Sequence, residues 1–326
     1  MSDAPARTLP QVAVAILDDF QDVTRKLADW GRLPPHVSLS VFNDHVEGET
    51  LIGRLLPFDV LVVTRERTPL PRSLIEKLPY LKLVVTAGMR NLGIDLAACR
   101  ERGVLVCGTG SGSSTTAELA WGLIIAVARH IPEEDKALRE GKWQRTIGVT
   151  LKDETLGILG LGKLGTQVAR IGLAFGMNVI AWSQNLTAER AADAGCVRVE
   201  KADLFRMADV LSIHLLMSER SRGMVGREEL ALMKSSAILI NTARAAIVDE
   251  AALIEALTSG KIAGAGIDVY SREPLPPDAP IRRAPNTVLT PHLGYVTRET
   301  YEIYFPEALE DVEAWLAGKP IRVITE

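Results

Sequence analysis

Three side chains suited to the reduction of a carbonyl group lie in the last third of the 326-residue sequence. Arg244 follows the apolar run 237–241, Glu273 precedes a proline-rich loop, and His292 follows the run TVLTP. Reduction by hydride builds negative charge on the carbonyl oxygen, which an imidazolium beside a carboxylate can protonate near neutral pH. A guanidinium fork can hold the carboxylate of a 2-keto acid and stabilise that oxygen. The trio therefore predicts interconversion of 2-keto and 2-hydroxy acids.

Each of the three residues also has a simpler structural explanation. Glu273 could be a solvated loop acid, Arg244 a partner in a surface ion pair, and His292 the polar cap of a strand. The catalytic interpretation depends on the three residues together, in a chain that also carries a nucleotide-binding motif.

The segment GLGKLG, residues 160–165, has the glycine spacing of a dinucleotide-binding turn. It follows an apolar strand at 155–159 and opens a helix that runs to about Phe175. A second strand follows at 178–182. This strand–turn–helix–strand context favours a dinucleotide site over a glycine turn chosen only for packing.

Each glycine of the motif has a separate expected role. Gly160 allows the tight turn, Gly162 lets a diphosphate approach the backbone, and Gly165 lets the helix pack closely on the strand. The diphosphate would then lie over free N–H groups at the positive end of the helix.

The second half of this fingerprint is an acid about 20 residues downstream, which binds the adenosine ribose. Here Ser183, Gln184 and Asn185 occupy the tip of the second strand. The tip has no carboxylate that would repel a 2′-phosphate. It also has no arginine that would bind one, since Arg190 lies well down the next helix. The expected cofactor is NAD, with NADP not excluded.

Short runs rich in Val, Ile and Leu alternate with helix-patterned segments over most of the chain. Such strands indicate parallel sheets covered by helices on both faces. Two sets of strands flank the long helical stretch 114–141, which predicts an α/β fold with two doubly wound parallel-sheet domains. The expected strands are 11–17, 37–42, 59–63, 81–86, 155–160, 178–182, 210–215, 237–241, 264–269 and 287–291.

Composition and charge exclude several classes of partner. The net charge of −4 is made of scattered charges of both signs, with no basic cluster for nucleic acid or a membrane surface. The first residues have no apolar signal core, and the apolar runs are shorter than the ~20 residues of a membrane span. The three cysteines have no metal-ligand spacing, so we expect reduced thiols, no metal and a cytoplasmic location.

Four segments together resemble the D-isomer-specific 2-hydroxyacid dehydrogenase family. They are GLGKLG, NTARAAIVDEAAL, AGIDVYSREPLP and NTVLTPHLGY, and they keep the family's order and spacing over nearly the whole chain. The resemblance implies an NAD(P)-dependent oxidoreductase that acts on the CH–OH group of a D-2-hydroxy acid. It also implies that Arg244, Glu273 and His292 are catalytic.

The resemblance further implies where the small molecules bind. Asp268 contacts the nicotinamide carboxamide, and Thr116 lies near the cofactor. The loop TAGMRNLGID takes the substrate carboxylate through the backbone N–H groups of Gly88 and Met89, and Arg244 and His292 complete the substrate site. The full expected cofactor set is Gly160, Gly162, Lys163, Leu164, Gly165, Ser183, Gln184, His214, Thr242, Ala243, Asp268 and Thr116.

In this family the cofactor domain is inserted into the substrate domain. The resemblance implies a flavodoxin-like substrate domain of residues 1–113 plus 300–326 and a Rossmann cofactor domain of residues 114–299. Catalysis is then expected in the cleft between the domains. The resemblance also implies a homodimer joined through the cofactor domains, where the helical stretch 114–141 lies.

Two positions depart from the family pattern. Ala245 replaces the glycine that usually follows the arginine, and Leu216 replaces the proline of a His-x-Pro pattern that begins at His214. The second change alters a loop that lines the adenosine side in relatives. His214 itself is expected to lie at the edge of the cofactor and not to be a catalyst.

Other functions remain open alternatives. A dinucleotide-sensing regulatory protein of the same fold would use domain closure as a switch, although the complete Arg–Glu–His set favours an enzyme. Formate-type relatives typically have glutamine where Glu273 stands, which disfavours that activity. A small phosphoglycerate-type enzyme remains compatible, and the identity of the 2-hydroxy acid is left open.

Overall fold

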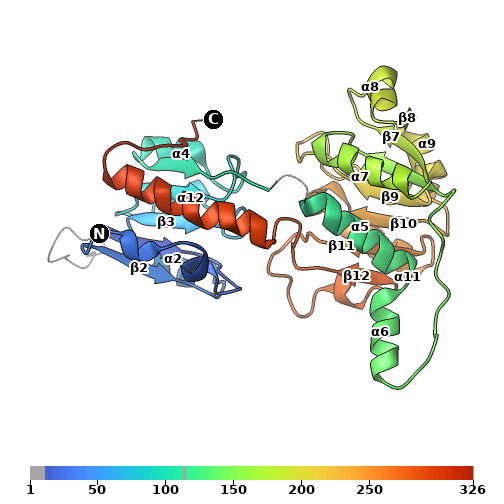
Figure 1. Ribbon diagram of the computed structural model, residues 1–326, viewed down its shortest axis with the longest axis horizontal. Coiled ribbons are helices and arrows are strands. Elements are labelled where there is room, and N and C mark those ends of the chain that lie inside the picture. Colours follow the sequence, from blue (N-terminus) through green and yellow to red (C-terminus); the bar gives the residue numbers. More distant parts are fainter. Residues whose placement is uncertain (1–11, 113–114, 326) are drawn as a thin grey trace. The chain divides into compact units, whose positions relative to one another are not determined.

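The structure is a computed structural model that describes residues 12–112 and 115–325. The chain divides into two compact units, coloured along the sequence in Figure 1. Unit 1 comprises residues 1–113 and 297–326, and unit 2 comprises residues 114–296.

Unit 1 is built around a parallel sheet with the strand order β2-β1-β3-β4-β5, which is the doubly wound order of flavodoxin-like domains. Strand β3, with the sequence VLVV, is buried at every position, as expected for a strand covered on both faces. The strands are β1 Val12–Ile16, β2 Val37–Val41, β3 Val60–Val63, β4 Leu83–Thr86 and β5 Leu105–Gly108.

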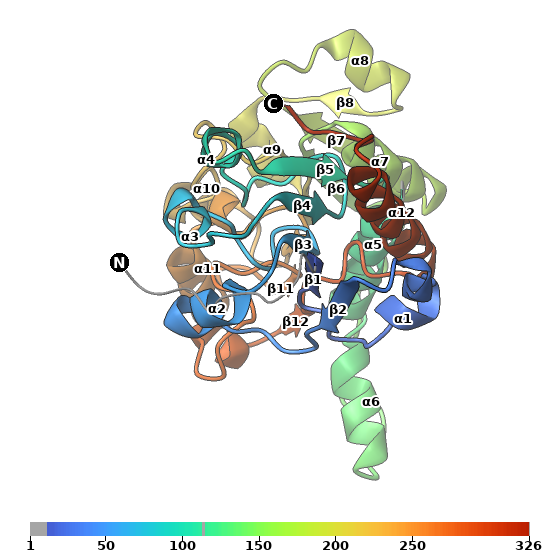
Figure 2. The same ribbon diagram turned by 90° about the vertical axis from the view of Figure 1, so that its left-hand side faces the viewer.

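Helices cover both faces of this sheet. Figure 2 shows α2, α3 and α4 on one face and α1 and α12 on the other. The helices are α1 Thr24–Leu27, α2 Gly48–Leu55, α3 Arg72–Ile75, α4 Leu96–Glu101 and α12 Arg298–Leu316, with a 3₁₀ turn η1 at Trp30–Arg32.

Unit 2 contains a parallel sheet with the strand order β12-β11-β10-β9-β6-β7-β8. The chain runs outward in one direction from β6 through β7 and β8, and in the other direction from β9 onward. The strands β6 and β9 therefore mark the point where a doubly wound sheet binds its ligands. The strands are β6 Thr155–Leu159, β7 Asn178–Trp182, β8 Val197–Arg198, β9 Val210–Ile213, β10 Ile238–Asn241, β11 Gly264–Ile267 and β12 Thr287–Leu289.

Two apolar cores, one on each face, hold the helices of unit 2 against its sheet. One core joins α5 and α7 to the strands, and the other joins α9, α10 and α11 to the opposite face. The helices are α5 Thr115–Ala128, α6 Ile131–Arg139, α7 Lys163–Ala174, α8 Ala188–Asp193, α9 Lys201–Met207, α10 Arg227–Leu232 and α11 Glu250–Thr258, with 3₁₀ turns η2 at Ala245–Ile247 and η3 at Pro280–Arg283.

The predicted class of two doubly wound parallel sheets is confirmed, but two details differ. The helical stretch 114–141 is two helices, because His130 takes a left-handed backbone (φ +51°) that cannot continue a helix and Pro132 lies in the first turn of α6. Strands β5 and β8 were not predicted, and β8 is only two residues long.

Some expectations fall on residues outside the described ranges. They are Gln11, the first residue of an expected strand, and Ser114, the first residue of the expected helical stretch. Within the described ranges, no helix is both long enough and apolar enough to cross a membrane.

Candidate active site

Arg244 lies in a tight turn just after β10, and Asn241, the last residue of the strand, holds this turn. Asn241 is buried, its Oδ1 accepts from the N–H of Ala243 at 3.0 Å, and its Nδ2 donates to the C=O of Arg244 at 3.2 Å. The Arg244 guanidinium donates through Nη1 to the C=O of Ala243 at 2.8 Å. The turn therefore places this cation at the carboxyl end of β10.

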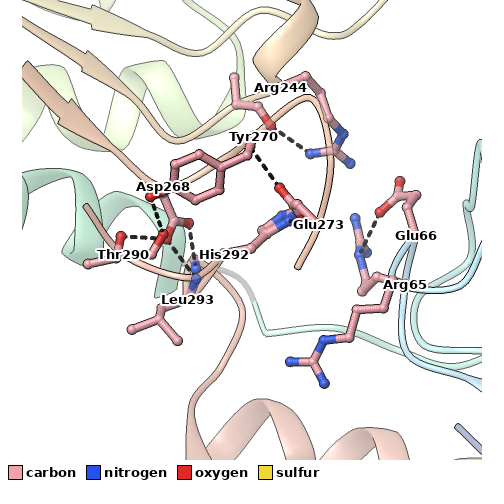
Figure 3. A network of polar contacts seen from close by, with 12 residues as sticks. Arg65, Glu66, Arg244, Asp268, Tyr270, Glu273, Thr290, His292 and Leu293 are labelled. Atoms are coloured by element: carbon pink, nitrogen blue, oxygen red, sulfur yellow. Dashed lines mark hydrogen bonds and ion pairs between the residues drawn. The ribbon is translucent and has the colours of Figure 1, made fainter. Parts of the chain in front are cut away.

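Glu273 and His292 form a hydrogen-bonded pair in the loops that follow β11 and β12 (Figure 3). His292 Nδ1 lies 2.6 Å from Glu273 Oε2, and the other carboxylate oxygen accepts the N–H of Tyr270 at 2.9 Å. Nδ1 therefore carries a proton, because a carboxylate can only accept. Nε2 makes no hydrogen bond with any described residue, which leaves it able to exchange a proton with a substrate.

The strands that carry these residues are neighbours in the sheet. β10 pairs with β11 and β11 pairs with β12, all in parallel, so their carboxyl ends lie along one edge. Residues that follow them meet there, and Figure 3 shows Arg244, Glu273 and His292 drawn from these three loops. The three candidate catalytic residues are thus brought to the same edge of unit 2.

The backbone of His292 is left-handed, with φ +54°, a conformation that costs about 1–3 kcal/mol and persists only where its surroundings enforce it. Asp268, which is fully buried just after β11, provides that enforcement. It accepts the hydroxyl of Thr290 at 2.6 Å and the N–H groups of Leu293 at 2.7 Å and Gly294 at 3.0 Å. These bonds fix the loop on both sides of the imidazole.

Thr115 and Thr116, at the first turn of α5, hold the same loop from another side. Both hydroxyls donate to the C=O of Gly294 at 2.8 Å. Burial raises the pKa of Asp268, and the three donors together with the charge of His292 oppose that effect. Asp268 and Thr116 therefore position the His292 loop, and their contact with a nicotinamide stays a prediction.

The glycine motif between β6 and α7 packs tightly at two glycines and is open at the third. Gly160 has φ +107°, and a Cβ there would lie 2.8 Å from the carbonyl carbon of His214. A Cβ on Gly165 would lie 2.1 Å from the carbonyl oxygen of Gly160, whereas a Cβ on Gly162 would meet nothing within 4 Å. This open space at the helix start fits the diphosphate of a dinucleotide.

The start of α7 has the features of an anion site. Gly162 is the N-cap and cannot offer a capping side chain, and Lys163 and Leu164 are the first two helical residues. The helix is 12 residues long, so its dipole adds a partial positive charge to these first N–H groups. Lys163, Leu164 and Gly165 thus lie in the first turn of α7, and their contact with a cofactor stays a prediction.

One side chain at the tip of β7 is hydrogen-bonded to the glycine motif. The Ser183 hydroxyl accepts the N–H of Leu161 at 2.8 Å, so Ser183 helps to hold the glycine turn. Gln184 is exposed and lies one residue further along. Of the two tip residues in the expected cofactor set, Gln184 is therefore the one whose side chain makes no hydrogen bond to the described residues of the turn.

The strand ends of β9 and β10 contribute the remaining predicted cofactor residues. Nε2 of His214 lies 2.8 Å from Ser212 Oγ, and burial lowers the pKa of His214 to about 4, so its ring is neutral at pH 7. Thr242, followed by Ala243, is 5 % exposed, and its buried hydroxyl has no hydrogen-bond partner among the described residues. A buried hydroxyl without a partner is uncommon and fits a polar group of a bound dinucleotide.

In unit 1, the loop after β4 departs from the expectation for the substrate carboxylate. The N–H of Gly88 donates to the Thr109 hydroxyl at 3.0 Å, so it is already used. The N–H of Met89 makes no hydrogen bond with a described residue. Gly88 has φ +86°, which favours glycine, and a Cβ there would lie 2.6 Å from Arg65 Nη1. Met89 is therefore the better donor of the two.

Asn241, Thr115 and Thr290 hold the site but were not among the predicted residues. Asn241 and Thr115 act through hydrogen bonds to backbone groups, Thr290 acts through its bond to the Asp268 carboxylate, and no spacing in the sequence marks any of the three. The polar residue at the end of β10 was the one available signal for Asn241. Among the described residues, no group of three or more His, Cys, Asp and Glu side chains could hold a metal ion.

Known proteins share both the sequence pattern and the architecture of this chain. Residues 121–294 match the family model described as D-isomer specific 2-hydroxyacid dehydrogenase, NAD binding domain. A glyoxylate reductase from Aeropyrum pernix is 39% identical over 281 residues, which cover 83% of this chain and 84% of that protein. A D-3-phosphoglycerate dehydrogenase from Archaeoglobus fulgidus is 36% identical over 277 residues, which cover 84% of this chain and 52% of that protein.

The chain therefore spans about half the length of its phosphoglycerate dehydrogenase relatives from Archaeoglobus fulgidus and Methanocaldococcus jannaschii, at 52% of each. Among solved structures, a phosphoglycerate oxidoreductase from Vibrio cholerae superimposes with a TM-score of 0.90 at 39% identity. That comparison covers 94% of this chain and 100% of the other.

Proposed function

The chain belongs to the D-isomer-specific 2-hydroxyacid dehydrogenase family, and on that premise we propose that it interconverts a D-2-hydroxy acid and its 2-keto acid with NAD. The observation that carries the proposal is the Glu273–His292 pair. The imidazole is held at Nδ1 at 2.6 Å from the carboxylate and has its other nitrogen available, on the sheet edge that also carries Arg244.

The protein's own residues divide the work of this reaction. The nicotinamide, when bound, supplies or takes up the hydride. His292 donates a proton from Nε2 to the carbonyl oxygen in reduction and takes it back in oxidation, while Glu273 stabilises the imidazolium. Arg244 binds the substrate carboxylate and the polarised oxygen through its fork of donors.

We further propose a division of labour between the two units. Unit 2 binds the dinucleotide with the glycine turn, the buried Thr242 hydroxyl and the strand ends around them. Unit 1 supplies substrate contacts from the loop after β4, with the N–H of Met89 as a donor to the carboxylate.

The experiment that tests the activity is a panel of substrates assayed with each cofactor. Reduction of glyoxylate and hydroxypyruvate is measured with NADH and with NADPH, and oxidation of D-3-phosphoglycerate with NAD. We expect keto-acid-dependent oxidation of NADH. Dinucleotide binding without turnover on any 2-keto or 2-hydroxy acid would instead support a dinucleotide-sensing protein.

Glu273→Gln is expected to move the pH dependence of reduction. The amide still fills the site but cannot offset the charge of the imidazolium, so the protonated donor is lost at lower pH than in the wild type. Reduction needs that protonated form, so its alkaline limb shifts toward acid and turnover near neutral pH falls. A turnover profile from acid to alkaline pH that overlays the wild type would contradict the pairing.

We also propose that the protein is a homodimer formed through the region of α5, α6 and the segment after α6. This region carries large exposed apolar side chains, with Trp143 74 %, Ile147 93 % and Leu138 58 % exposed. It also contains a hollow of about 590 Å³, lined in part by Ile125 and Ile131. Exposed apolar surface of this kind supports a contact with a second copy of the chain.

Ile147→Asp combined with Trp143→Ser is expected to separate the subunits. A charge at the most exposed apolar position and the loss of an indole remove the apolar contact that joins two copies. Light scattering after gel filtration should then fall from twice 35.4 kDa to 35.4 kDa. Val197→Asp, which also adds a charge at an exposed apolar residue of unit 2, serves as the control that keeps the dimer.

We propose that the protein is located in the cytoplasm, because its cysteines are not joined in disulfides. Cys99, Cys107 and Cys196 are free and buried in the structure. Free buried thiols agree with a reducing compartment. Fractionation of the source cells with an antibody to the protein tests this location.

A further inference from the structure

Tyr270 links the two loops that carry Glu273 and His292. Tyr270 is 8 % exposed, and its hydroxyl lies 3.0 Å from the C=O of Ile267 and 3.0 Å from the C=O of Thr290. Figure 3 shows Tyr270 beside Glu273 and Thr290. Its single proton is shared between two carbonyl oxygens. Because the N–H of Thr290 also donates to the C=O of Ile267 at 2.9 Å, the hydroxyl continues the ladder between β11 and β12 past the ends of the strands.

The backbone of Tyr270 holds Glu273, the residue that pairs with His292. Its N–H donates to Glu273 Oε1 at 2.9 Å, while Glu273 Oε2 holds His292 Nδ1 at 2.6 Å. The N–H of His292 donates in turn to the C=O of Thr290 at 3.0 Å, which is the same carbonyl that accepts the tyrosine hydroxyl. These bonds form a closed ring that begins and ends at Tyr270.

The simpler explanation of Tyr270 is packing, and phenylalanine would fill the same space. The hydroxyl adds only its bonds to the two carbonyl groups, and both lie at the base of the His292 loop. Burial raises the pKa of Tyr270 above that of an ordinary phenol, helped by the charges of Asp268 and Glu273 and opposed by Arg282. The hydroxyl therefore remains a donor over the pH range in which an imidazole titrates.

We propose that Tyr270 is a positioning residue for the proton donor. Its hydroxyl fixes the Thr290 carbonyl, and through it the left-handed backbone of His292, so that the ring stays paired with Glu273 while Nε2 faces the substrate. This role rests on the proposed function. In the described part of unit 2, the imidazole bonds to the Glu273 carboxylate, interacts with the charge of Asp268, and lies with its centroid 5.4 Å from that of the Tyr295 ring.

The test is Tyr270→Phe in the full-length protein. With the best substrate of the panel, kcat is expected to fall about 3- to 10-fold, the effect of losing one neutral hydrogen bond. The KM for NADH is expected to stay within about twofold. The alkaline limb of the reduction profile is expected to move toward acid, because the ring is held less firmly against Glu273.

The matched control is Thr287→Val, which removes a hydroxyl bond to the C=O of Ala284 at the opposite end of β12. It is expected to leave kcat and the pH profile unchanged. In a Glu273→Gln background, Tyr270→Phe is expected to have a smaller effect than in the wild type, since the pairing that it supports is already weakened. An equal effect in both backgrounds, or an unchanged kcat, overturns the proposal.

A readout without turnover keeps this inference separate from the proposed function. The chain has five histidines, and the ring signal of His292 in an NMR spectrum can be assigned by its loss in His292→Asn. In Tyr270→Phe the midpoint of that signal's titration is expected to move to lower pH, and in Thr287→Val it is expected to stay. A wild-type protein inactive on every panel substrate overturns the enzymatic function, whereas an unshifted titration overturns the role of Tyr270.

Discussion

Replacement of His292 by asparagine is expected to slow the reduction of keto acids by about 10²–10⁴-fold in kcat, the usual contribution of a positioned general acid. Glu273 Oε2 holds Nδ1 of the imidazole at 2.6 Å, which leaves Nε2 as the proton donor. Asparagine has no group that can replace it near neutral pH, so the developing alkoxide would depend on water for its proton.

Asparagine is the appropriate replacement because the backbone of residue 292 is left-handed, with φ +54°. Asparagine is among the residues that tolerate this region best, so the fold should be kept. His292→Ala is expected to lose the same activity and in addition to lower the melting temperature, since alanine is strained there. A turnover rate near that of the wild type in His292→Asn would exclude this residue as the donor.

Arg244→Ala is expected to lower kcat/KM for the keto acid by about 10²–10³-fold, as found when a donor to a developing oxyanion is removed. The guanidinium stands at the end of β10 on a turn held by Asn241. Alanine removes the fork without changing that turn, because the bonds of Asn241 are made to backbone groups. Steady-state kinetics with the best substrate of the panel measures the loss.

Two further variants show whether geometry or charge carries the effect of Arg244. Arg244→Lys keeps the positive charge but has no planar fork, so its kcat/KM is expected to lie between those of the wild type and Arg244→Ala. Arg206→Ala removes an exposed cation of α9, which pairs with Asp203 at 3.1 Å, and is expected to leave the kinetics unchanged. Comparable kinetics in Arg244→Ala and the wild type would rule out the assignment.

The spacing of residues determined much of the fold. Runs such as VLVV and ILIN are short and apolar at nearly every position, as strands covered on both faces are, and their alternation with helical segments predicted the two doubly wound sheets. The glycine turn and the Arg, Glu and His motifs could also be predicted, because they depend on neighbouring residues or on the order of motifs along the chain.

The hydrogen bonds that hold the site could not be predicted from residue spacing in the same way. Asp268 was expected to contact the cofactor, and in the structure its carboxylate accepts three donors from the His292 loop. The Gly88 N–H was expected to take a carboxylate, and it donates to Thr109, 21 residues away. Each of these hydrogen bonds requires a distance of about 3 Å between residues that are far apart in sequence.

Residue types and their order in the chain therefore determined the class of the fold and the candidates for chemistry. The tertiary structure decided how those candidates are held: the register of β10, β11 and β12 brings their loops to one edge, and Tyr270 closes a ring of bonds between two of them. The physical reason is that apolar patterns and turn preferences are set by residues close together in the sequence. A hydrogen bond, by contrast, is set by the placement of whole strands.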